Sequence, residues 1–508
     1  MKKTTASLLA IVIWFGSSAL ISAQAQPSEP SADLDKFVQK TLEKFPEIPG
    51  IAVVVIKGDK PAFLKAYGMA DKESGVNADV DTMWYIASST KSFTALAAAL
   101  MDKDGKIMLD DPVMKYTAGM TLRNPIPEKV KIRDLLIHTS GLRNGPLGFR
   151  MAYSGESDPK DMAKVFADGT TFNDEAYGRY AYTNLGYNIY AVLLQNHLKM
   201  RWQDLLQKRV FDPLGMDHTT SYISRAKAKK WKVAAPYMVD PGSGNTVRSP
   251  LAKTDSNLQS AGGMFASASD LGRWLIVNIN DGRLGGKQIF PAEIMKAVHT
   301  GHTTTEREQP PFSGAGEYGL GWQIGKYGDK KVIYHHGGFP GYRSHISYLP
   351  EQKIGVAVLV NEGTIGGRVA DLVATYAYDR LTDGETVEAD YAKRLEETFD
   401  AYQIGKKRFM DGFAERAKRP WQLSEPRTSY AGTYENNLLG RMEVAVEGES
   451  VMVRLGSMRA KATAFTEKET IRVELIPGMG EVIRFTKNAD GQVESLSYGG
   501  NEFKRIAK

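Results

Sequence analysis

The spacing of apolar residues differs between two parts of the chain, which are joined by a charged segment. In residues 33–385 helix-period stretches alternate with short apolar runs, whereas residues 428–508 hold short segments that alternate apolar and polar positions between glycines. The intervening residues 386–427 are dominated by charged residues and helix formers, with prolines near the end, which predicts a helical linker. We therefore expect a large domain, a linker and a small all-β domain that forms a barrel or a sandwich.

The large domain has the pattern of an α+β fold in which helices flank an antiparallel sheet. A helix at 33–45 precedes a hairpin formed by 51–56 and 62–67, and an amphipathic helix begins close to Ser88. The polar, Gly/Pro-rich stretch 145–171 is expected to be a loop or lid. Four later strands with short links predict a meander in the same sheet, at 321–324, 331–334, 341–349 and 354–360.

Composition narrows the function classes. The 508 residues are too many for one compact domain, and 42% hydrophobic with 24% charged residues is ordinary for a globular protein. The net charge of +6 is spread along the chain without a basic stripe, so nucleic acid is not an expected partner. The absence of cysteine excludes a thiol nucleophile, a cysteine zinc site and a disulfide framework.

The N-terminus has the pattern of a secretory signal peptide. Lys2 and Lys3 precede an apolar run at 8–21, and residues 23–25 form an Ala-x-Ala cleavage site. The alternative is a membrane anchor, but the run is short for a bilayer span. We expect cleavage after Ala25, export to the periplasm or the extracellular space, and no stable membrane insertion afterwards.

Ser88 and Lys91 stand three residues apart where a loop turns into the helix that follows. Residues at this spacing share one helix face, so the Lys91 amine can reach the Ser88 hydroxyl and activate it as a nucleophile. The alternative is an ordinary helix cap at Ser88. The pattern is weak alone, because it recurs at 157–160 and 224–227.

Tyr182 and Asn184 are expected on a loop before a second helix. A tyrosine there can shuttle a proton if a nearby cation lowers its pKa, and the Asn184 amide can hold a substrate carbonyl or orient a lysine. The alternative is a core tyrosine with a helix-capping asparagine. His138 is a further candidate base, but its place beside Thr139 and Gly141 at a helix end favours a structural role.

A third group lies at the end of a predicted strand, with the sequence His335-His336-Gly337-Gly338. Glycines there let a substrate or another backbone approach closely. The two histidines are not interpreted as a metal site, because the sequence places no carboxylate or third histidine near them. No cofactor is expected.

The three groups occur in the order Ser88-x-x-Lys91, Tyr182-x-Asn184 and His335-x-Gly337, each in a fitting local setting. This set resembles the serine β-lactamase and penicillin-binding-protein superfamily, in its class C-like branch, over residues 33–385. The tail from about residue 428 resembles the lipocalin-like β-domain often appended to such hydrolases.

The resemblance implies a helical subdomain inserted beside the sheet, with the active site between them. Ser88 would form an acyl-enzyme, while Lys91 and Tyr182 would handle its proton, the lysine kept partly neutral by burial and by a neighbouring cation. Asn184 would orient Lys91 and the substrate. The site would also use His335, Gly337 and Gly338, with His335 bordering the substrate beside Tyr182 and the N–H groups of Ser88 and Gly338 forming an oxyanion hole.

One departure from the family bears on the substrate. Many β-lactamases have Lys-Thr-Gly where this chain has His335-His336-Gly337, and a mostly neutral histidine is a poorer partner for a substrate carboxylate. We therefore expect a small ester, amide or D-amino-acid peptide as substrate, with weak or absent β-lactam turnover. The alternatives are a D,D-peptidase, transpeptidase or acyltransferase, or a catalytically silent sensor or binding domain. Oligomeric state and the roles of the β-domain and His336 stay open.

Overall fold

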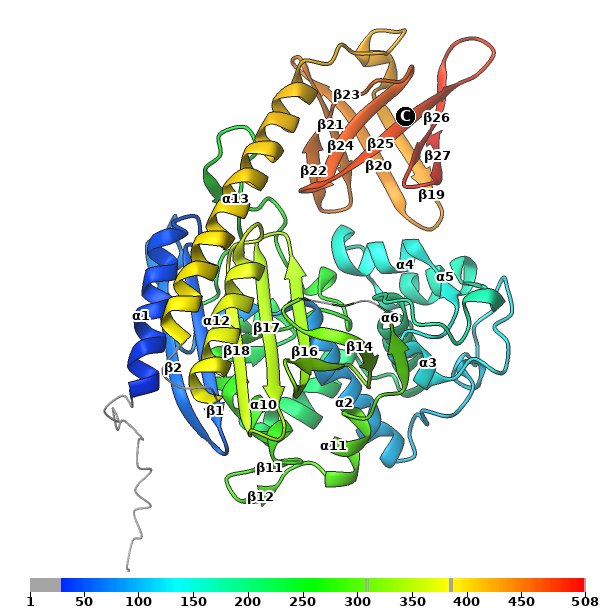
Figure 1. Ribbon diagram of the computed structural model, residues 1–508. Coiled ribbons are helices and arrows are strands. Elements are labelled where there is room, and N and C mark those ends of the chain that lie inside the picture. The colour runs from blue at the N-terminus through cyan, green and yellow to red at the C-terminus, as the bar shows by residue number, and fades with distance from the viewer. Residues whose placement is uncertain (1–28, 307, 309, 383–386, 507–508) are drawn as a thin grey trace, which may run out of the picture.

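The computed structural model describes residues 29–306, 308, 310–382 and 387–506, and a large antiparallel sheet lies at its centre (Figure 1). The order is β13-β14-β15-β16-β17-β18-β1-β2-β3, so the predicted meander and the N-terminal hairpin do form one sheet. The strands are β1 (Gly50–Lys57), β2 (Lys60–Asp71), β3 (Val76–Asn77), β13 (Thr303–Thr305), β14 (Ser313–Tyr318), β15 (Gln323–Tyr327), β16 (Lys330–Phe339), β17 (Tyr342–Leu349) and β18 (Ile354–Val360).

Helices cover both faces of this sheet, and its central strands are buried on both sides. Alternate residues of β1 enter opposite cores, with Val53 and Val55 on one side and Val54 and Ile56 on the other. The first face packs under α1 (Glu29–Lys44), α12 (Gly366–Thr382) and the first part of α13 (Val387–Ala417). The second packs against α2 (Thr90–Lys103), α10 (Ala268–Ile279) and α11 (Ala292–Val298).

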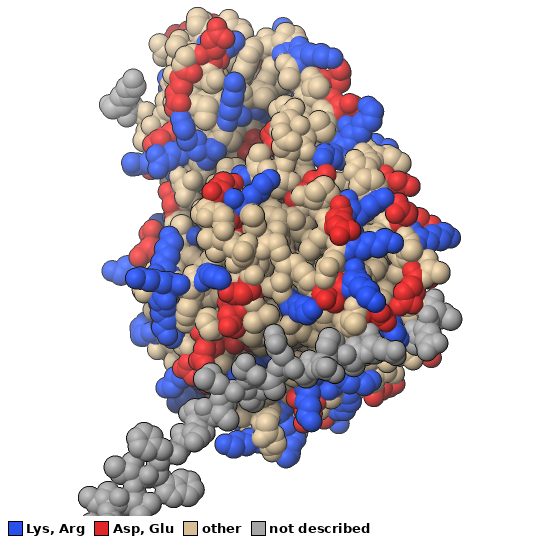
Figure 2. Space-filling model, turned by 90° about the vertical axis from the view of Figure 1, so that its left-hand side faces the viewer, with Lys and Arg blue, Asp and Glu red and all other residues tan. Residues whose placement is uncertain are grey.

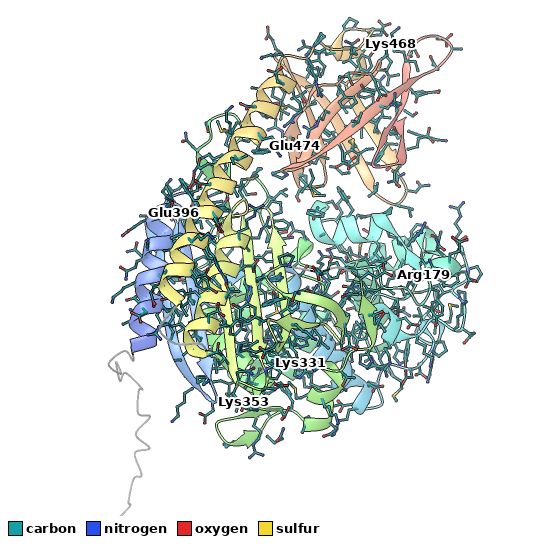
Figure 3. The ribbon with its side chains drawn as sticks, viewed as in Figure 1. Arg179, Lys331, Lys353, Glu396, Lys468 and Glu474 are labelled. Carbon is teal, nitrogen blue, oxygen red and sulfur yellow. The ribbon has the colours of Figure 1, made fainter. Side chains whose placement is uncertain are left out.

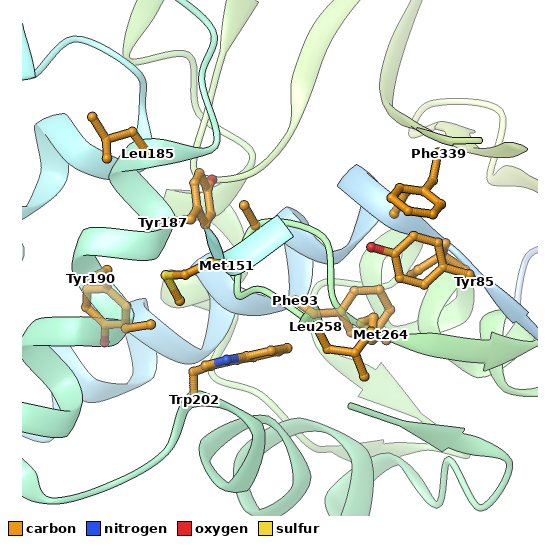
Figure 4. Close-up of a cluster of buried hydrophobic side chains, with 14 of the residues drawn as sticks. Tyr85, Phe93, Met151, Leu185, Tyr187, Tyr190, Trp202, Leu258, Met264 and Phe339 are labelled. Atoms are coloured by element: carbon orange, nitrogen blue, oxygen red, sulfur yellow. The ribbon is translucent and has the colours of Figure 1, made fainter. Parts of the chain in front are cut away.

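A helical lobe adjoins the second face, and its apolar side chains merge with those of α2 in one core (Figure 4). The expectation of a loop at 145–171 is wrong, because this stretch is largely helical. Pro146 and Pro159 stand in the first turns of helices, where a missing N–H costs nothing, and Asn144 and Asp158 cap them. The lobe's helices are α3 (Ile132–Leu136), α4 (Gly145–Phe149), α5 (Pro159–Gly169), α6 (Leu185–Leu198) and α7 (Trp202–Leu206).

Strand β16 is longer than predicted. It continues through the two glycines to Phe339, where the sequence suggested a link, because Gly337 and Gly338 pair in register with Ser344 and Arg343 of β17. The turn is thereby reduced to the residues between Phe339 and Tyr342. The His335 to Gly338 segment is therefore held rigidly in the sheet.

Helix α13 leads away from the large domain to a separate C-terminal sheet (Figure 1). Its order is β22-β21-β20-β19-β27-β26-β25-β24-β23, and β22 packs back against β24, so the sheet curls into a nearly closed barrel around an apolar core. The strands are β19 (Gly432–Asn436), β20 (Gly440–Glu447), β21 (Ser450–Leu455), β22 (Met458–Lys461), β23 (Thr463–Ala464), β24 (Thr470–Ile476), β25 (Met479–Lys487), β26 (Val493–Tyr498) and β27 (Asn501–Ile506).

The surface carries both signs of charge. On the face shown in Figure 2, basic and acidic side chains are intermixed rather than gathered by sign. Among the described residues, no helix combines the length and the apolarity that crossing a bilayer requires. The predicted signal peptide lies outside the described residues.

Candidate active site

Ser88 lies in a tight turn that is clamped to the sheet. Residues Ala87–Ser89 form a 3₁₀ turn directly before α2, and Ala87 has φ 45°, a left-handed conformation that costs a non-glycine residue roughly 1 kcal/mol or more. Two hydrogen bonds hold the turn: Ser344 Oγ donates to the Ile86 carbonyl at 2.8 Å, and Ser89 Oγ donates to the His335 carbonyl at 3.1 Å. The surrounding structure thus enforces the strained turn that presents Ser88.

Glycines allow this close contact. A Cβ atom at Gly337 would lie 2.0 Å from the Ile86 carbonyl oxygen, and one at Gly262 would lie 3.3 Å from the Ala87 carbonyl carbon. The close approach that the sequence predicted for the glycine of His335-x-Gly337 is therefore made by the backbone just before Ser88.

Lys91 lies on the first turn of α2 and is fully buried. Its Nζ atom lies 3.2 Å from Ser88 Oγ, 2.7 Å from Asn184 Oδ1 and 2.9 Å from the Ala261 carbonyl oxygen. Within the described ranges it forms no ion pair, and burial holds its pKa well below the ordinary value. The expected neighbouring cation is not needed, since burial alone is the cause.

The three contacts of Lys91 fit a neutral amine. A neutral amine has two N–H donors and one lone pair. Nζ is placed to donate to all three oxygens; in the neutral form Asn184 Oδ1 and the Ala261 carbonyl, which can only accept, take its two donors and its lone pair faces Ser88 Oγ. The arrangement is that of a base directed at a nucleophile.

Tyr182 lies on the loop before α6 and contacts both partners. Its ring centroid lies 4.8 Å from Lys91 Nζ. Although 43% of the residue is exposed, desolvation raises the pKa of Tyr182 above its ordinary value, and a hydrogen bond with Ser88 opposes part of that rise. The sequence-based idea that a cation lowers this pKa is not supported, so Tyr182 is a protonated hydroxyl able to donate.

Asn184 occupies the cap position of α6, yet its side chain makes no capping hydrogen bond. Its amide oxygen instead accepts from Lys91. The capping interpretation of Asn184 is therefore excluded, and the sequence-based role of orienting Lys91 matches the geometry.

Two buried histidines border the site. His335 Nδ1 donates to the His336 carbonyl at 2.8 Å, which leaves Nε2 toward the Tyr318 hydroxyl at 3.4 Å, and burial lowers the pKa of His335 to about 3. Its ring centroid lies 6.1 Å from that of Tyr182. His138 accepts the Thr183 N–H at 3.4 Å and packs 4.6 Å from the Tyr182 ring. His138 therefore positions the Tyr182 loop, a structural role beside the chemistry.

Two cavities meet at Tyr182. One of about 300 Å³ is lined by Ser88, His335 and Gln323 among others. A larger one of about 670 Å³ lies between the helical lobe and the C-terminal barrel. The barrel side is lined by Leu439, Ile476, Met479, Glu481, Tyr498, Gly499 and Asn501.

The structure brings the predicted side chains of Ser88, Lys91, Tyr182, Asn184 and His335 together at one site, and Gly337 and Gly338 lie on the strand beside it. Sequence reasoning missed Tyr318, the Ala261 carbonyl and the barrel residues. No local pattern predicts the role of a backbone carbonyl or a contact between domains. The motif Ala261-Gly262-Gly263 is recognisable in the sequence only as a feature of the family.

Comparison with known proteins decides the family. The family model described as Beta-lactamase matches residues 38–377, well over half of the chain. The chain belongs to the beta-lactamase family. This match agrees with the resemblance to the serine β-lactamase and penicillin-binding-protein superfamily, and the solved structures below share its fold.

Protein flp of Staphylococcus aureus (strain N315) is 25% identical over 340 residues, which is 66% of this chain. This chain spans about 64% of the length of that curated relative. The octameric penicillin-binding protein homologue from Pyrococcus abyssi superposes with a TM-score of 0.59 at 23% identity, over 93% of this chain and 99% of that chain. The D-amino acid amidase from Ochrobactrum anthropi SV3 superposes with a TM-score of 0.56 at 22% identity, over 69% of this chain and 98% of the amidase chain.

The Pyrococcus match extends beyond the family domain. The superposition covers 93% of this chain, which is too large a share to leave out the C-terminal barrel. The Pyrococcus structure therefore resembles this chain in both the large domain and the barrel. The similarity concerns the fold.

Proposed function

We propose that this family member hydrolyses an ester or amide through a covalent acyl intermediate on Ser88. The observation that carries the proposal is the set of three contacts of Lys91, which directs an amine lone pair at Ser88 Oγ over 3.2 Å. A protein that only binds a ligand has no need for a buried lysine without an ion pair beside a partly exposed serine, because burying that amine is costly.

In acylation, Ser88 Oγ attacks the substrate carbonyl carbon and its proton passes to Lys91 Nζ. The N–H groups of Ser88 and Gly338 are the proposed donors to the resulting oxyanion. When the intermediate collapses, the leaving group takes a proton, for which the protonated Tyr182 hydroxyl and the Lys91 ammonium are the nearest donors. Water then attacks the acyl-enzyme, and Ser88 Oγ regains its proton as the acid leaves.

The larger cavity supports a bulky substrate. Its volume of about 670 Å³ is in the range of small-molecule sites, and Leu142, Phe149 and Tyr498 are among its apolar walls. Arg143 and Arg179 also line it, and neither makes an ion pair in the part of the chain that the structure describes. Figure 3 shows Arg179 in the helical lobe. These arginines favour a substrate with an anionic group at the end remote from Ser88, such as a peptide carboxylate.

Covalent labelling of the full-length protein tests the proposal. We expect a fluorophosphonate to add one mass adduct to the wild type and none to Ser88→Ala. Ser224→Ala is the matched control, because Ser224 heads the same Ser-x-x-Lys spacing on an exposed surface and forms no site. Labelling of folded Ser88→Ala, or no labelling of the wild type, would sink the proposal in favour of a silent binding domain.

Substrate ranking follows the labelling. Turnover of short-chain p-nitrophenyl esters, D-amino-acid amides and a penicillin would order the substrate classes. An acceptor competition assay separates hydrolysis from acyl transfer, since an added amine outcompetes water for the acyl group in a transferase. We also propose export, with the first 25 residues as a cleaved signal peptide, which N-terminal sequencing of the mature protein checks.

A further inference from the structure

A second cluster of chemically reactive side chains lies on the opposite face of the sheet from Ser88. His336 of β16 and His345 of β17 are cross-strand partners, and Asp371 comes from α12, which covers this face. His336 Nε2 lies 3.2 Å from His345 Nδ1 and 3.2 Å from Asp371 Oδ1, and His345 Nδ1 lies 2.7 Å from the same oxygen. No local pattern predicts a carboxylate or a third histidine beside His336, yet the fold brings Asp371 and His345 there.

We propose that His336, His345 and Asp371 bind one Zn²⁺ ion. Zinc binds histidine nitrogen and carboxylate oxygen at about 2.0–2.2 Å in tetrahedral geometry, so its ligand atoms lie roughly 3.3 Å apart. The three atoms of the cluster, separated by 2.7 to 3.2 Å, form a slightly contracted face of such a tetrahedron. One carboxylate and two neutral imidazoles are a donor set suited to this cation.

The surroundings of the cluster match those of a built metal site. His345 Nε2 lies 2.6 Å from Ser347 Oγ, which lies 2.7 Å from the Tyr378 hydroxyl, so the outer nitrogen is held and Nδ1 faces the other ligands. The Phe312 ring stacks on His336 with 9° between the ring planes. Such outer contacts fix the orientation of each imidazole before the ion arrives.

One side of the cluster is open. The side chains of His336 and Asp371 are each 27% exposed, whereas that of His345 is fully buried. A water molecule can therefore supply the fourth ligand, and the ion can enter from solvent. Strand β16 also carries His335 and Gly337, which lie beside the proposed active site. The ion would therefore connect this strand to α12 through His336 and Asp371.

The alternative is that the cluster holds no ion and shares a proton between Asp371 and the two histidines. A metal-binding measurement distinguishes these two possibilities. The full-length protein without a polyhistidine tag is stripped with chelator, dialysed and titrated with Zn²⁺ by calorimetry. We expect one ion per chain, a higher unfolding temperature with Zn²⁺, and visible ligand-field bands when Co²⁺ replaces it.

Variants assign the site. His336→Ala and Asp371→Asn should abolish the binding, and both positions are exposed enough for the fold to survive, which circular dichroism verifies. Ser347→Ala should weaken it roughly 10-fold. His218→Ala, at a histidine 3.8 Å from Asp81 and outside the cluster, should bind as the wild type does. No binding to the wild type, or wild-type affinity in either cluster variant, would overturn the proposal. Fluorophosphonate labelling of Ser88 does not depend on these results.

Discussion

Lys91 Nζ lies 3.2 Å from Ser88 Oγ, and its other two polar contacts are both to oxygen atoms that can only accept. The pair is therefore more than a consequence of helical spacing. The same spacing at Ser224 and Lys227 lies on a surface helix, where Ser224 instead donates to Asp255. What distinguishes Ser88 is a partner that is fully buried and whose pKa burial lowers.

Asn184→Asp should move the acidic limb of the pH–rate profile to higher pH. Because burial lowers the pKa of Lys91, the wild type should be active at neutral pH and lose activity as pH falls and Lys91 becomes protonated. A carboxylate in place of the amide 2.7 Å from Nζ favours the ammonium form and so raises the pKa of Lys91. The measurement is the rate of acylation by an activated ester between pH 5 and 10.

Asn188→Asp provides the comparison for this profile. Asn188 lies one turn further along α6 and bonds to Gln259 instead of Lys91, so its charge should move the limb far less. An acidic limb that stays in place in Asn184→Asp would show that Lys91 is not the titrating base.

Lys91→Met should flatten the pH dependence of stability while it abolishes turnover. Burial lowers the pKa of Lys91 in the folded protein, whereas the unfolded chain keeps the amine protonated up to about pH 10. The unfolded state therefore binds the extra proton, and the free energy of unfolding of the wild type rises with pH toward 10. Removing one such group lowers that slope by up to about 1.4 kcal/mol per pH unit.

Chemical denaturation at several pH values between 7 and 10 measures this slope. Lys253 is also buried with a lowered pKa, so Lys253→Met should reduce the slope in the same way but leave Ser88 open to labelling. An unchanged slope in Lys91→Met would mean that the lysine is already charged in the folded protein.

Gly337→Ala should disable the nucleophile turn. The added methyl group would lie 2.0 Å from the Ile86 carbonyl oxygen, which is backbone and cannot yield without moving the turn that carries Ser88. We expect a loss of about 1–3 kcal/mol in unfolding free energy and a large fall in kcat. Gly325→Ala on β15, whose methyl group would find its first neighbour at 3.5 Å, should leave both nearly unchanged.

Much of this site follows from local sequence, and the rest from long-range packing. The spacing of Ser88 and Lys91 and the loop before α6 are local features, so they could be predicted. The full length of β16 could not be predicted from the sequence. Glycines more often indicate the end of a strand than a position where another backbone contacts the strand closely. His345 and Asp371 meet His336 only through strand register and helix docking, which no short pattern encodes.

Met479→Ala should weaken binding of substrates with large acyl groups and spare small ones. Met479 begins β25 of the barrel, is 59% exposed, and lines the cavity that also holds Tyr182. Removing its side chain takes away apolar contact worth about 1–2 kcal/mol for a group that reaches it, so KM should rise roughly 5- to 30-fold for a long-chain ester. The acetyl ester, which ends near Ser88, should keep its KM, and kcat should stay constant for both.

Lys468→Ala is the matched barrel variant, since Figure 3 places Lys468 at the end of the barrel remote from the large domain. Its kinetics should equal those of the wild type for every chain length. If Met479→Ala changes KM equally for the acetyl and the long-chain ester, the barrel affects the active site as a whole and does not contact the acyl group. A selective effect on the long chain would instead make the C-terminal barrel part of the substrate pocket, and would explain why the beta-lactamase-family domain carries it.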